Sequence, residues 1–445
     1  MERYPDRMTT TAVLLAAGFG TRMKSARPKA LHAIAGRPML QHLIASCETV
    51  FDRVVVVTGP GMESVAAAAA PHTIVVQHDR LGTAHAALQA AHLFGNGDVA
   101  VLYADNPLVR PDTLRRLLDA RAGADLAMLA MCPADPGRYG RVIQRDGQSG
   151  GDVVRIVEWA VATEAERAIG LCNAGVFCAE AATLERWLRG VRPSATGEFF
   201  LTDCVEAAVA EGGRVLAVEA DEAELRGVNS RVELAEAEAT AQSWLRRAAM
   251  EGGATLVAPE TVTLCFDTVL EPDVLVCPHV VFGPGVHVAS GAEIRSFSHL
   301  EGCRVGPGAL VGPYARLRPG TELGQGAHVG NFVELKATRL GAGAKANHLT
   351  YLGDSDVGAA TNIGAGTITC NYDGYAKHRT HIGANVFVGT HATLVAPVSL
   401  GDGAFVAAGS VIVRDVPADA MAFGRAPQVD KPGRAATYRT GKEKT

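Results

Sequence analysis

Aliphatic residues recur at every sixth position through much of the second half of this 445-residue chain. A period of six fits neither an α-helix, whose apolar stripe repeats every 3.6 residues, nor an amphipathic strand, whose period is two. It is typical of a parallel β-helix, in which each hexapeptide supplies a short strand and a corner and its aliphatic residue points inward. Glycine, which permits tight corners, is dense in the same region. The positions are Val274, Val280 and Val286; Val305, Val311, Leu317, Leu323, Val329 and Leu335; and Ile382, Val388, Leu394, Leu400, Val406 and Ile412.

The register of this repeat breaks twice. The step from Leu335 to Val357 is 22 residues and that from Ile363 to Ile382 is 19, and neither is a whole number of hexads. We interpret both breaks as insertions, which in a solenoid form surface loops and often binding faces. The two segments contain KATRLGAGAKANHLTYLGD and CNYDGYAKHRTH, where lysine, histidine, asparagine and tyrosine concentrate. We therefore expect a second functional site there.

The first half of the chain has a different texture. Short β-branched runs (TAVLLAA, RVVVVTG, TIVVQ, VAVLYAD) alternate with helix-like segments, which is typical of βαβ units and a mostly parallel sheet. The segment from Asn229 to Met250 lacks proline and glycine and predicts a connecting helix. We expect a polar extension over residues 1–10, an α/β domain over 11–228, a linker helix over 229–251, a β-helix over 252–425 and a tail over 426–445.

Composition and charge argue against nucleic acid and membranes as partners of this chain. The net charge of −5 and the pI near 6.3 give no electrostatic reason to expect nucleic acid or an anionic membrane as a partner. The nine cysteines are scattered without a CxxC pair, so we interpret them as reduced thiols. The apolar run from Ala12 to Ala17 is too short to span a membrane. We expect a cytoplasmic protein that binds small molecules.

The stretch LLAAGFGTRMKSARPKAL, from Leu14 to Leu31, predicts a phosphate-binding loop. A glycine-rich turn after a buried strand can present several backbone N–H groups to a phosphate, and Arg22 and Lys29 would add full charges. Two well-known phosphate loops do not match. A Walker A motif needs glycine and lysine where Met23 and Lys24 stand, and a dinucleotide fingerprint needs glycine at Met23.

Strings from both halves resemble one family, the bacterial bifunctional N-acetylglucosamine-1-phosphate uridylyltransferases and glucosamine-1-phosphate N-acetyltransferases. They are LAAGFGTRM, PKALH, LGTAHA, GEFFLTD, GVNSR, GPYARLRPG, VGNFVELK, HLTYLGD, NIGAGTITCNYDG and FGRAPQ. The resemblance implies a Rossmann-like α/β nucleotidyltransferase domain followed by a left-handed parallel β-helix. It also implies a homotrimer with small-molecule substrates.

For the first half, the resemblance implies that a sugar phosphate attacks the α-phosphorus of UTP and that pyrophosphate leaves. Arg22 and Lys29 would be the catalytic cations, and Asp105 and Asn229 would hold Mg²⁺, which prefers oxygen ligands. Gln77, Gly82 and Thr83 would read the uracil. The remaining residues implied for UTP and UDP-N-acetylglucosamine are Leu15, Ala16, Ala17, Gly18 and Tyr103, with Gly140, Glu158 and Asn173 at the sugar.

For the second half, the resemblance implies that an amine attacks the thioester of acetyl-CoA. His348 would be the general base, a role that suits histidine because it titrates near neutral pH. Arg318 and Lys336 would bind the phosphate of glucosamine-1-phosphate, with Tyr351 and Asn362 completing that pocket. The positions implied for acetyl-CoA are Ala365, Asn371, Tyr372, Thr390, Ala408 and Arg425.

The chain departs from the family pattern at several positions. Ala104 stands where the family usually has glycine before the metal aspartate, and Thr390 replaces a serine that faces the coenzyme. Ala160 and Val161 replace a lysine and an aspartate after the sugar-binding glutamate, which affects the expectation for uridylyl transfer most. Two alternatives therefore stay open: a single-activity sugar-1-phosphate nucleotidyltransferase whose β-helix serves assembly, and a non-catalytic trimeric scaffold.

Overall fold

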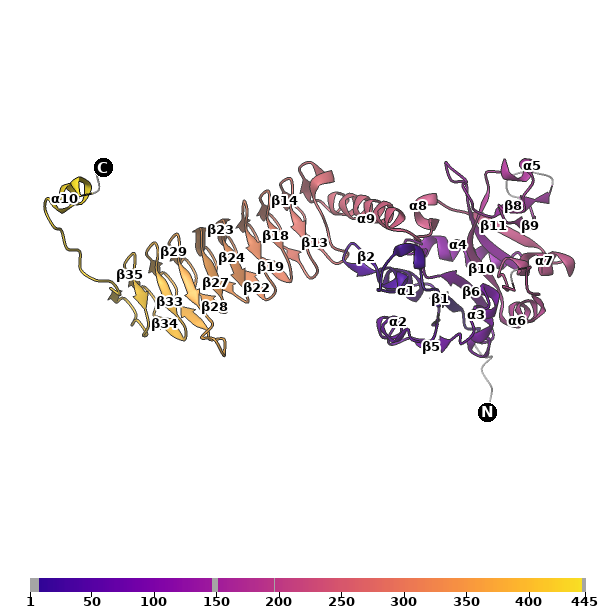
Figure 1. Ribbon diagram of the computed structural model, residues 1–445, viewed down its shortest axis with the longest axis horizontal. Coiled ribbons are helices and arrows are strands. Elements are labelled where there is room, and N and C mark those ends of the chain that lie inside the picture. Colours follow the sequence, from indigo (N-terminus) through magenta and orange to yellow (C-terminus); the bar gives the residue numbers. More distant parts are fainter. Residues whose placement is uncertain (1–7, 146–150, 196, 442–445) are drawn as a thin grey trace. The chain divides into compact units, whose positions relative to one another are not determined.

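The computed structural model describes residues 8–145, 151–195 and 197–441 (Figure 1). The chain divides into two compact units, Met1–Gln242 and Ser243–Thr445. Residues 1–7 of the predicted extension and 442–445 of the predicted tail lie outside the described residues. Within the described ranges, no helix combines the length and the apolar character that crossing a bilayer requires.

The first unit is built on a twisted, mostly parallel sheet, as predicted. Its main strand order is β11-β7-β10-β6-β1-β4-β5, and β10 runs antiparallel to both of its neighbours. The smaller strands β8 and β9 extend it at β10. The strands are β1 (Thr11–Leu15), β4 (Arg53–Thr58), β5 (Thr73–Val76), β6 (Asp98–Tyr103), β7 (Leu126–Met131), β8 (Arg141–Gln144), β9 (Val153–Val157), β10 (Cys172–Glu180) and β11 (Val215–Glu219), with the separate hairpin β2 (Ala33–Ile34) and β3 (Arg37–Pro38).

Two hydrophobic cores lie on the two faces of this sheet, because successive strand residues point to opposite sides. On β1, Leu14 faces a core with α1, α2 and α4, whereas Val13 faces one with α3, α6 and α7. The helices are α1 (Met39–Glu48), α2 (Glu63–Ala68), α3 (Thr83–Gln89), α4 (Pro111–Arg121), α5 (Glu164–Arg167), α6 (Ala181–Gly190), α7 (Asp203–Ala210), α8 (Glu222–Leu225) and α9 (Arg231–Glu251). Helix α9 corresponds to the predicted connecting helix, and the division between the two units falls within it.

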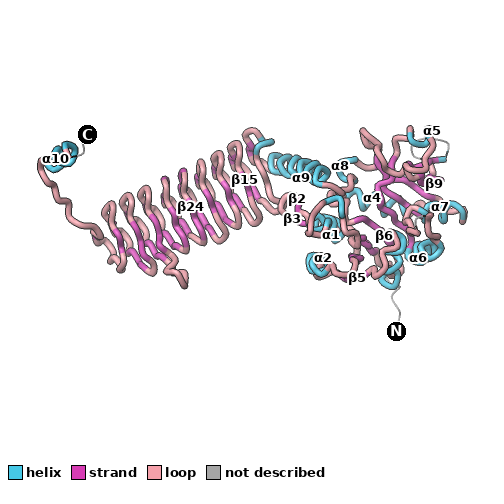
Figure 2. The backbone as a smooth tube through the Cα atoms, in the orientation of Figure 1, coloured by secondary structure: helices cyan, strands magenta, loops and turns pink. Residues whose placement is uncertain are grey.

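The second unit is the left-handed parallel β-helix of hexapeptide repeats, with three parallel sheets as the sides of a prism (Figure 2). The first sheet contains β12 (Thr255–Leu256), β14 (Leu275–Val276), β17 (Glu293–Ile294), β20 (Leu310–Val311), β23 (His328–Asn331), β26 (Lys345–His348), β29 (Asn362–Ile363), β32 (Phe387–Val388), β35 (Phe405–Val406) and β37 (Met421–Ala422). The second contains β15 (Val281–Phe282), β18 (His299–Leu300), β21 (Arg316–Leu317), β24 (Glu334–Lys336), β27 (Tyr351–Gly353), β30 (Ile368–Cys370), β33 (Thr393–Val395) and β36 (Val411–Ile412). The third contains β13 (Val269–Leu270), β16 (His287–Val288), β19 (Cys303–Val305), β22 (Thr321–Leu323), β25 (Arg339–Leu340), β28 (Ser355–Val357), β31 (Thr380–Ile382) and β34 (Val398–Leu400). A short helix, α10 (Arg434–Thr440), follows in the tail.

The interpretation of the first register break as an insertion is wrong. Between Leu335 and Val357 the buried residues Leu340, Ala346 and Leu352 continue the inward row, in steps of five, six, six and five. Each five-residue step shortens one corner by a residue. The region of HLTYLGD therefore belongs to the regular wall of the prism and not to a loop.

The second break is an insertion. Val357 pairs with Ile382, 25 residues further on, whereas Leu317 pairs with Leu335 after 18. The additional residues form a loop after β30, in which Tyr375 is 98% exposed. The carboxylate of Asp373 closes this loop by accepting hydrogen bonds from the backbone N–H groups of Tyr375 and Ala376, at 2.8 and 2.7 Å.

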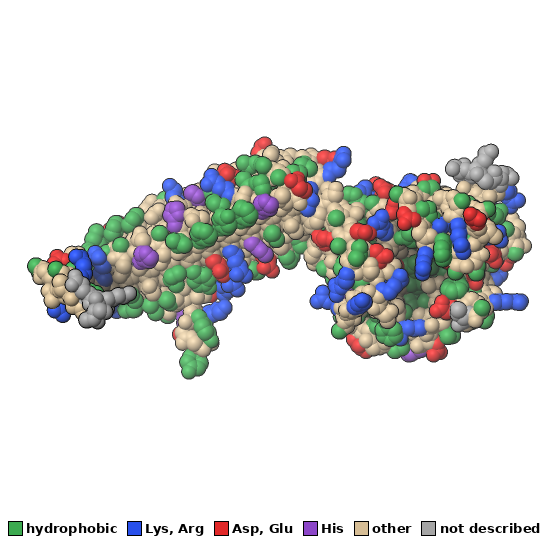
Figure 3. Space-filling model, turned by 45° about the horizontal axis from the view of Figure 1, so that its top comes forward, with side chains coloured by type: hydrophobic (Ala, Val, Ile, Leu, Met, Phe, Trp, Pro, Cys, Tyr) green, Lys and Arg blue, Asp and Glu red, His purple; other side chains and the backbone are tan. Residues whose placement is uncertain are grey.

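One corner of the β-helix carries a row of stacked rings. His279, Phe297, Tyr314 and Phe332 occupy equivalent corner positions of successive turns, with ring centroids 4.9–5.3 Å apart. We call these four residues the aromatic row. The three aromatic side chains of Phe297, Tyr314 and Phe332 are about half exposed. Figure 3 shows hydrophobic side chains gathered in long rows on the surface of this unit.

Candidate functional site

A cavity of about 550 Å³ opens at the carboxyl ends of β1 and β6 in the first unit. This edge is where ligands bind in open α/β sheets. The structure places around it every residue that the resemblance assigned to the nucleotide and the sugar. They are Leu15, Ala16, Ala17, Gly18, Lys29, Gln77, Gly82, Thr83, Tyr103, Asp105, Gly140, Glu158, Asn173 and Asn229.

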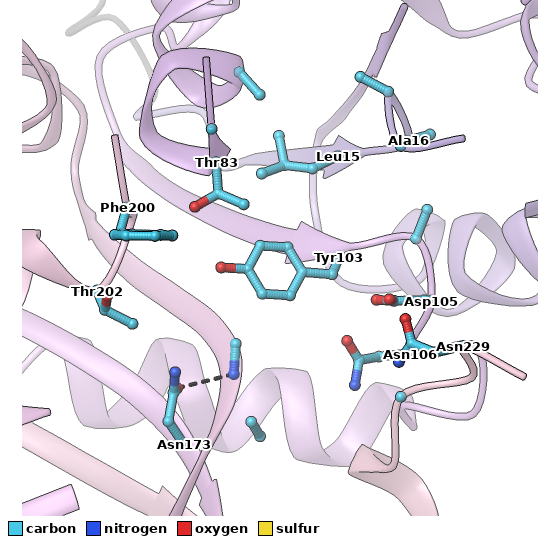
Figure 4. Close-up of a pocket in the computed structure, with 18 of the residues that line it drawn as sticks. Leu15, Ala16, Thr83, Tyr103, Asp105, Asn106, Asn173, Phe200, Thr202 and Asn229 are labelled. Atoms are coloured by element: carbon cyan, nitrogen blue, oxygen red, sulfur yellow. Dashed lines mark hydrogen bonds between the residues drawn. The ribbon is translucent and has the colours of Figure 1, made fainter. Parts of the chain in front are cut away.

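At one end of the cavity, a lysine ammonium lies between two side-chain oxygen atoms. Lys29 Nζ is 2.5 Å from Asp105 Oδ2 and 2.9 Å from Asn229 Oδ1. Arg22 Nη2 donates to the same Asn229 oxygen at 2.9 Å. Figure 4 shows Asp105 and Asn229 together at this end, beside Asn106. Two side-chain oxygens that already converge on one cation are a donor set suited to Mg²⁺.

Local sequence explains why Lys29 reaches this place. Pro28 precedes the short 3₁₀ turn over Lys29–Leu31 and sets its entry. Gly20 has a φ of +65°, and a Cβ there would lie 2.5 Å from Lys29 Cβ. The glycine therefore lets the loop turn and leaves room for the lysine side chain.

An arginine that the sequence analysis missed lines the cavity and supports the loop. Arg80 Nε donates to the carbonyl oxygen of Ala17 at 2.8 Å, and its guanidinium carbon lies 3.7 Å from the centre of the Phe19 ring. The guanidinium packs against Gly59, where a side chain would collide with it. The hydrogen bond from Arg80 fixes the direction of the Ala17 carbonyl in the loop. Its sequence neighbourhood, RLGT, contains no signal for this contact beyond its closeness to Gly82.

The opposite end of the cavity carries amide, hydroxyl and ring groups. Thr83, Phe200 and Thr202 lie there, and the Tyr103 ring stands between them and Asp105 (Figure 4). The Leu201 N–H donates to Thr83 Oγ1 at 2.9 Å. Phe200 and Thr202 were not predicted individually, although both belong to the string GEFFLTD.

The sugar end, as the resemblance places it, is formed by β8, β9 and β10. Asn173 Oδ1 accepts a hydrogen bond from the Gly175 N–H at 2.9 Å (Figure 4). Burial raises the pKa of the Glu158 carboxyl, whose oxygen lies beside Gly140. Val161 is 77% exposed and does not line this cavity, so the aspartate that it replaces would also have pointed to solvent from this backbone. Ala104 fits in the cavity wall, 4% exposed.

In the second unit, a polar cluster gathers where the strands of the second sheet of the β-helix end. Lys336 Nζ lies 2.8 and 3.0 Å from the two carboxylate oxygens of Asp354, and Asn371 Nδ2 donates to Asp354 Oδ2 at 2.5 Å. Desolvation by burial opposes ionisation of Asp354, but the hydrogen bonds from Lys336 and Asn371 outweigh it and lower the pKa of the carboxyl. Arg318 Nη1 donates to Glu334 at 2.9 Å. Asp354 and Glu334 were missed, because carboxylates do not suggest a phosphate site by themselves.

His348 ends β26, and Asn362 begins the neighbouring strand β29. His348 Nδ1 lies 2.9 Å from Asn331 Oδ1, on the strand below. With the amide oxygen of Asn331 assigned to that contact, Nδ1 carries the ring proton and Nε2 keeps a lone pair. Nε2 can then accept a proton from a substrate.

The positions implied for acetyl-CoA follow the β-helix axis. Ala365, Thr390 and Ala408 lie just after β29, β32 and β35, at one corner of successive turns. Asn371 and Tyr372 begin the inserted loop, where the Tyr372 hydroxyl donates to the Gly374 carbonyl at 2.6 Å. Arg425 follows β37.

Two family models match the chain, one in each unit. The model of the MobA-like NTP transferase domain matches residues 12–186, and that of the bacterial transferase hexapeptide (six repeats) matches residues 379–414. A solved structure of UDP-glucose pyrophosphorylase complexed with UDP-glucose covers 54% of this chain and 100% of its own, with 19% identity and a TM-score of 0.44.

Full-length relatives share the name bifunctional protein GlmU. The relative from Gluconacetobacter diazotrophicus is 68% identical, covering 97% of this chain and 95% of its own length. The relative from Granulibacter bethesdensis is 65% identical, with 96% of both chains covered. The relative from Acidiphilium cryptum is 62% identical, covering 98% of this chain and 100% of its own. With this identity over nearly the whole length, the chain belongs to the bifunctional GlmU family of uridylyltransferases and acetyltransferases.

Proposed function

We propose that the chain makes UDP-N-acetylglucosamine in two steps at two separate sites. The β-helix acetylates glucosamine-1-phosphate with acetyl-CoA, and the first unit then transfers UMP from UTP to N-acetylglucosamine-1-phosphate and releases pyrophosphate. The observation that carries the second step is the cavity that gathers the loop, Lys29 and the Asp105–Asn229 pair, with Arg22 hydrogen-bonded to Asn229.

The chemistry of uridylyl transfer suits this cavity. The sugar phosphate oxygen attacks the α-phosphorus of UTP and pyrophosphate leaves, so the protein has chiefly to align the reactants and neutralise charge. Lys29 supplies a positive charge at one end of the cavity, and Arg22, which does not line the cavity, supplies a second one beside Asn229. We assign the uracil to Gln77, Gly82 and Thr83, which lie around the start of α3.

We also propose that Asp105 and Asn229 hold Mg²⁺, with substrate phosphates and water as its other ligands. The contact of both oxygens with the Lys29 ammonium supports a cation at this place. When bound, the ion would neutralise the phosphates and the leaving pyrophosphate. Among the described residues, no group of three or more histidine, cysteine, aspartate or glutamate side chains is arranged to hold a metal. A site with few protein ligands agrees with magnesium, which keeps several waters.

For acetyl transfer, we propose that Nε2 of His348 takes the proton of the attacking amine. Lys336 and Arg318 bind the sugar phosphate, while Tyr351 and Asn362 position the sugar. Asn371, Tyr372, Ala365, Thr390, Ala408 and Arg425 would contact acetyl-CoA. The support is the fixed orientation of the His348 ring by Asn331 and the short corner that leads from His348 to β27, which pairs with the strand of Lys336.

We further propose that three copies assemble, as the family resemblance implies. The exposed aromatic row offers an apolar surface along the β-helix for such an assembly. Light scattering on the purified full chain gives the number of copies directly. A monomer at micromolar concentration would contradict the trimer without affecting the assignment of the two reactions.

Product analysis by mass spectrometry tests both steps in one mixture of glucosamine-1-phosphate, acetyl-CoA, UTP and Mg²⁺. UDP-N-acetylglucosamine should accumulate. If the reaction stops at N-acetylglucosamine-1-phosphate, the first unit has another substrate. If neither product forms, the result favours the non-catalytic scaffold. His348→Ala should abolish CoA release and leave pyrophosphate release from N-acetylglucosamine-1-phosphate intact. Asp105→Asn should abolish pyrophosphate release and leave CoA release intact. Any remaining uridylyl transfer should need a higher Mg²⁺ concentration for half-maximal turnover.

A further inference from the structure

A buried arginine directly follows a segment that lines the sugar end of the cavity. Arg141 begins β8 and is 2% exposed. Tyr139 and Gly140, the two residues before it, line the cavity, whereas Arg141 does not. Neither the predicted site nor the proposed reaction gives Arg141 a role.

The guanidinium of Arg141 donates to four backbone carbonyl oxygens. Three of them belong to the preceding loop: Nη1 donates to Pro136 at 3.3 Å and to Tyr139, and Nη2 donates to Gly137 at 3.1 Å. The fourth belongs to Arg167, the last residue of α5, and lies 3.3 Å from Nε. Within the described ranges, no carboxylate forms an ion pair with Arg141.

A buried charge without an anionic partner is unfavourable for stability, because carbonyl groups replace only part of its hydration. An apolar side chain at the start of a strand avoids this loss. What an arginine adds is a rigid planar fork of donors, which can fix several carbonyl groups at once. Arg141 therefore orders the backbone of the loop from Pro136 to Gly140.

This backbone order matters because Gly140 has no side chain with which to contact a sugar. Its carbonyl oxygen accepts a hydrogen bond from the Asn173 N–H at 2.8 Å, so its own N–H is the group left for a sugar hydroxyl. The arginine network also reaches the second segment at the sugar end. Arg167 Nε donates to the carbonyl oxygen of Trp159 at 3.3 Å, directly after Glu158 in the chain. One buried guanidinium thus connects both segments.

We propose that Arg141 is a positioning residue for the sugar phosphate in uridylyl transfer. It holds the Gly140 N–H and the Glu158 segment in the arrangement that the sugar requires, without contacting the sugar. The proposal rests on the proposed uridylyltransferase function and adds the residue that sets its affinity for the sugar substrate. The nucleotide end should be unaffected, because the residues that we assign to the uracil lie around the start of α3.

Steady-state uridylyl transfer by the full chain tests this, with N-acetylglucosamine-1-phosphate and UTP varied in turn. Arg141→Met should raise the KM for the sugar phosphate about ten- to hundredfold, because displacing a contacting group by about 1 Å can cost on the order of a hundredfold. The KM for UTP should stay unchanged. Arg121→Met is the matched control, since Arg121 is also largely buried in the first unit, pairs with Asp98 at 3.3 Å and does not line the cavity. It should lower the stability in urea and change neither KM.

Three results would overturn the proposal: an unchanged KM for the sugar phosphate, equal increases in both KM values, or the same increase in Arg121→Met. Each would leave Arg141 with a role in stability alone. If Arg141→Met does not fold, Arg141→Lys replaces it. A compact ammonium lacks the fork that spans the loop and α5, so the KM for the sugar phosphate should still rise, and an unchanged value overturns the proposal. A parent chain that forms no UDP-N-acetylglucosamine from these substrates would instead refute the proposed function, and the positioning role with it.

Discussion

Gly175 and Tyr103 allow a stringent test of the geometry of the first unit. Gly175 lies on β10 with a φ of +76°, directly after the Asn173 turn. A Cβ added there would collide with Cε2 of Tyr103 and lie 2.5 Å from Cδ2. The Tyr103 ring lines the cavity, so a ring that is pushed aside would occupy space that we assign to substrate.

The cost of Gly175→Ala has two parts. An alanine at this φ costs about 1–2 kcal/mol of backbone strain. Overpacking against a ring costs about another 1–3 kcal/mol. Gly212 separates the two, because its φ is +77° and a Cβ there would meet nothing within 4 Å. Gly212→Ala should therefore show the strain alone, and Gly175→Ala should be less stable than Gly212→Ala by about 1–3 kcal/mol.

Urea unfolding followed by tryptophan fluorescence measures the difference, since Trp187 of the first unit is 3% exposed. Uridylyl transfer should lose activity in Gly175→Ala and keep it in Gly212→Ala, whereas acetyl transfer should be unaffected in both. Equal stabilities and equal uridylyl activities of the two variants would refute the argument, because they would show that Tyr103 yields without cost and does not bound the substrate space.

Three other changes follow from the structure. Leu352→Ala should destabilise the β-helix by about 2–5 kcal/mol in denaturant unfolding, because Leu352 is fully buried in a prism of small cross-section. Arg80→Ala should raise the KM for UTP about five- to thirtyfold, since the Ala17 carbonyl loses a charged donor worth about 1–2 kcal/mol; an unchanged KM would contradict its role in supporting the loop. Burial raises the pKa of Glu158, so the stability that its protonation gives is complete at acidic pH and is lost as pH rises through the folded-state value. Glu158→Gln should therefore gain stability over the parent as pH rises above the ordinary pKa of a glutamate carboxyl in thermal unfolding, and a difference that is constant with pH would exclude burial as the cause.

The repeat could be predicted from sequence because only the inward positions of a prism are restricted to aliphatic residues. The prediction failed where the step between two inward residues is five residues instead of six. Leu340, Ala346 and Leu352 are aliphatic as well, but a search at a fixed step of six passes over them once a corner loses a residue. Thr369 adds a second difficulty, since it is an inward residue, 1% exposed, with a polar side chain that donates to backbone carbonyls.

The cavity residues were predictable as a set because the strings that contain them resemble one family. Strand ends alone indicate only the loop over residues 16–29 and Asp105, which follow β1 and β6. The side-chain contacts within the cavity could not be predicted from the sequence. Nothing in the string RPKAL indicates that Lys29 lies between Asp105 and Asn229, which are 76 and 200 residues away. The contact of Arg80 with Ala17 depends in the same way on the open space at Gly59, which only the folded backbone defines.

The two sites share an arrangement that explains how a chain with a net charge of −5 can bind polyanions. Each cation that we assign to a phosphate already has an internal anionic or amide partner: Lys29 has Asp105 and Asn229, and Lys336 has Asp354. An unpaired ammonium at these largely buried positions would be costly, so the partners hold it in place before substrate arrives. The positive charge is then local and oriented, and binding does not have to supply the energy to order it. A diffuse basic surface would attract nucleic acid as readily as sugar phosphates, whereas a few paired and oriented cations favour small phosphorylated ligands.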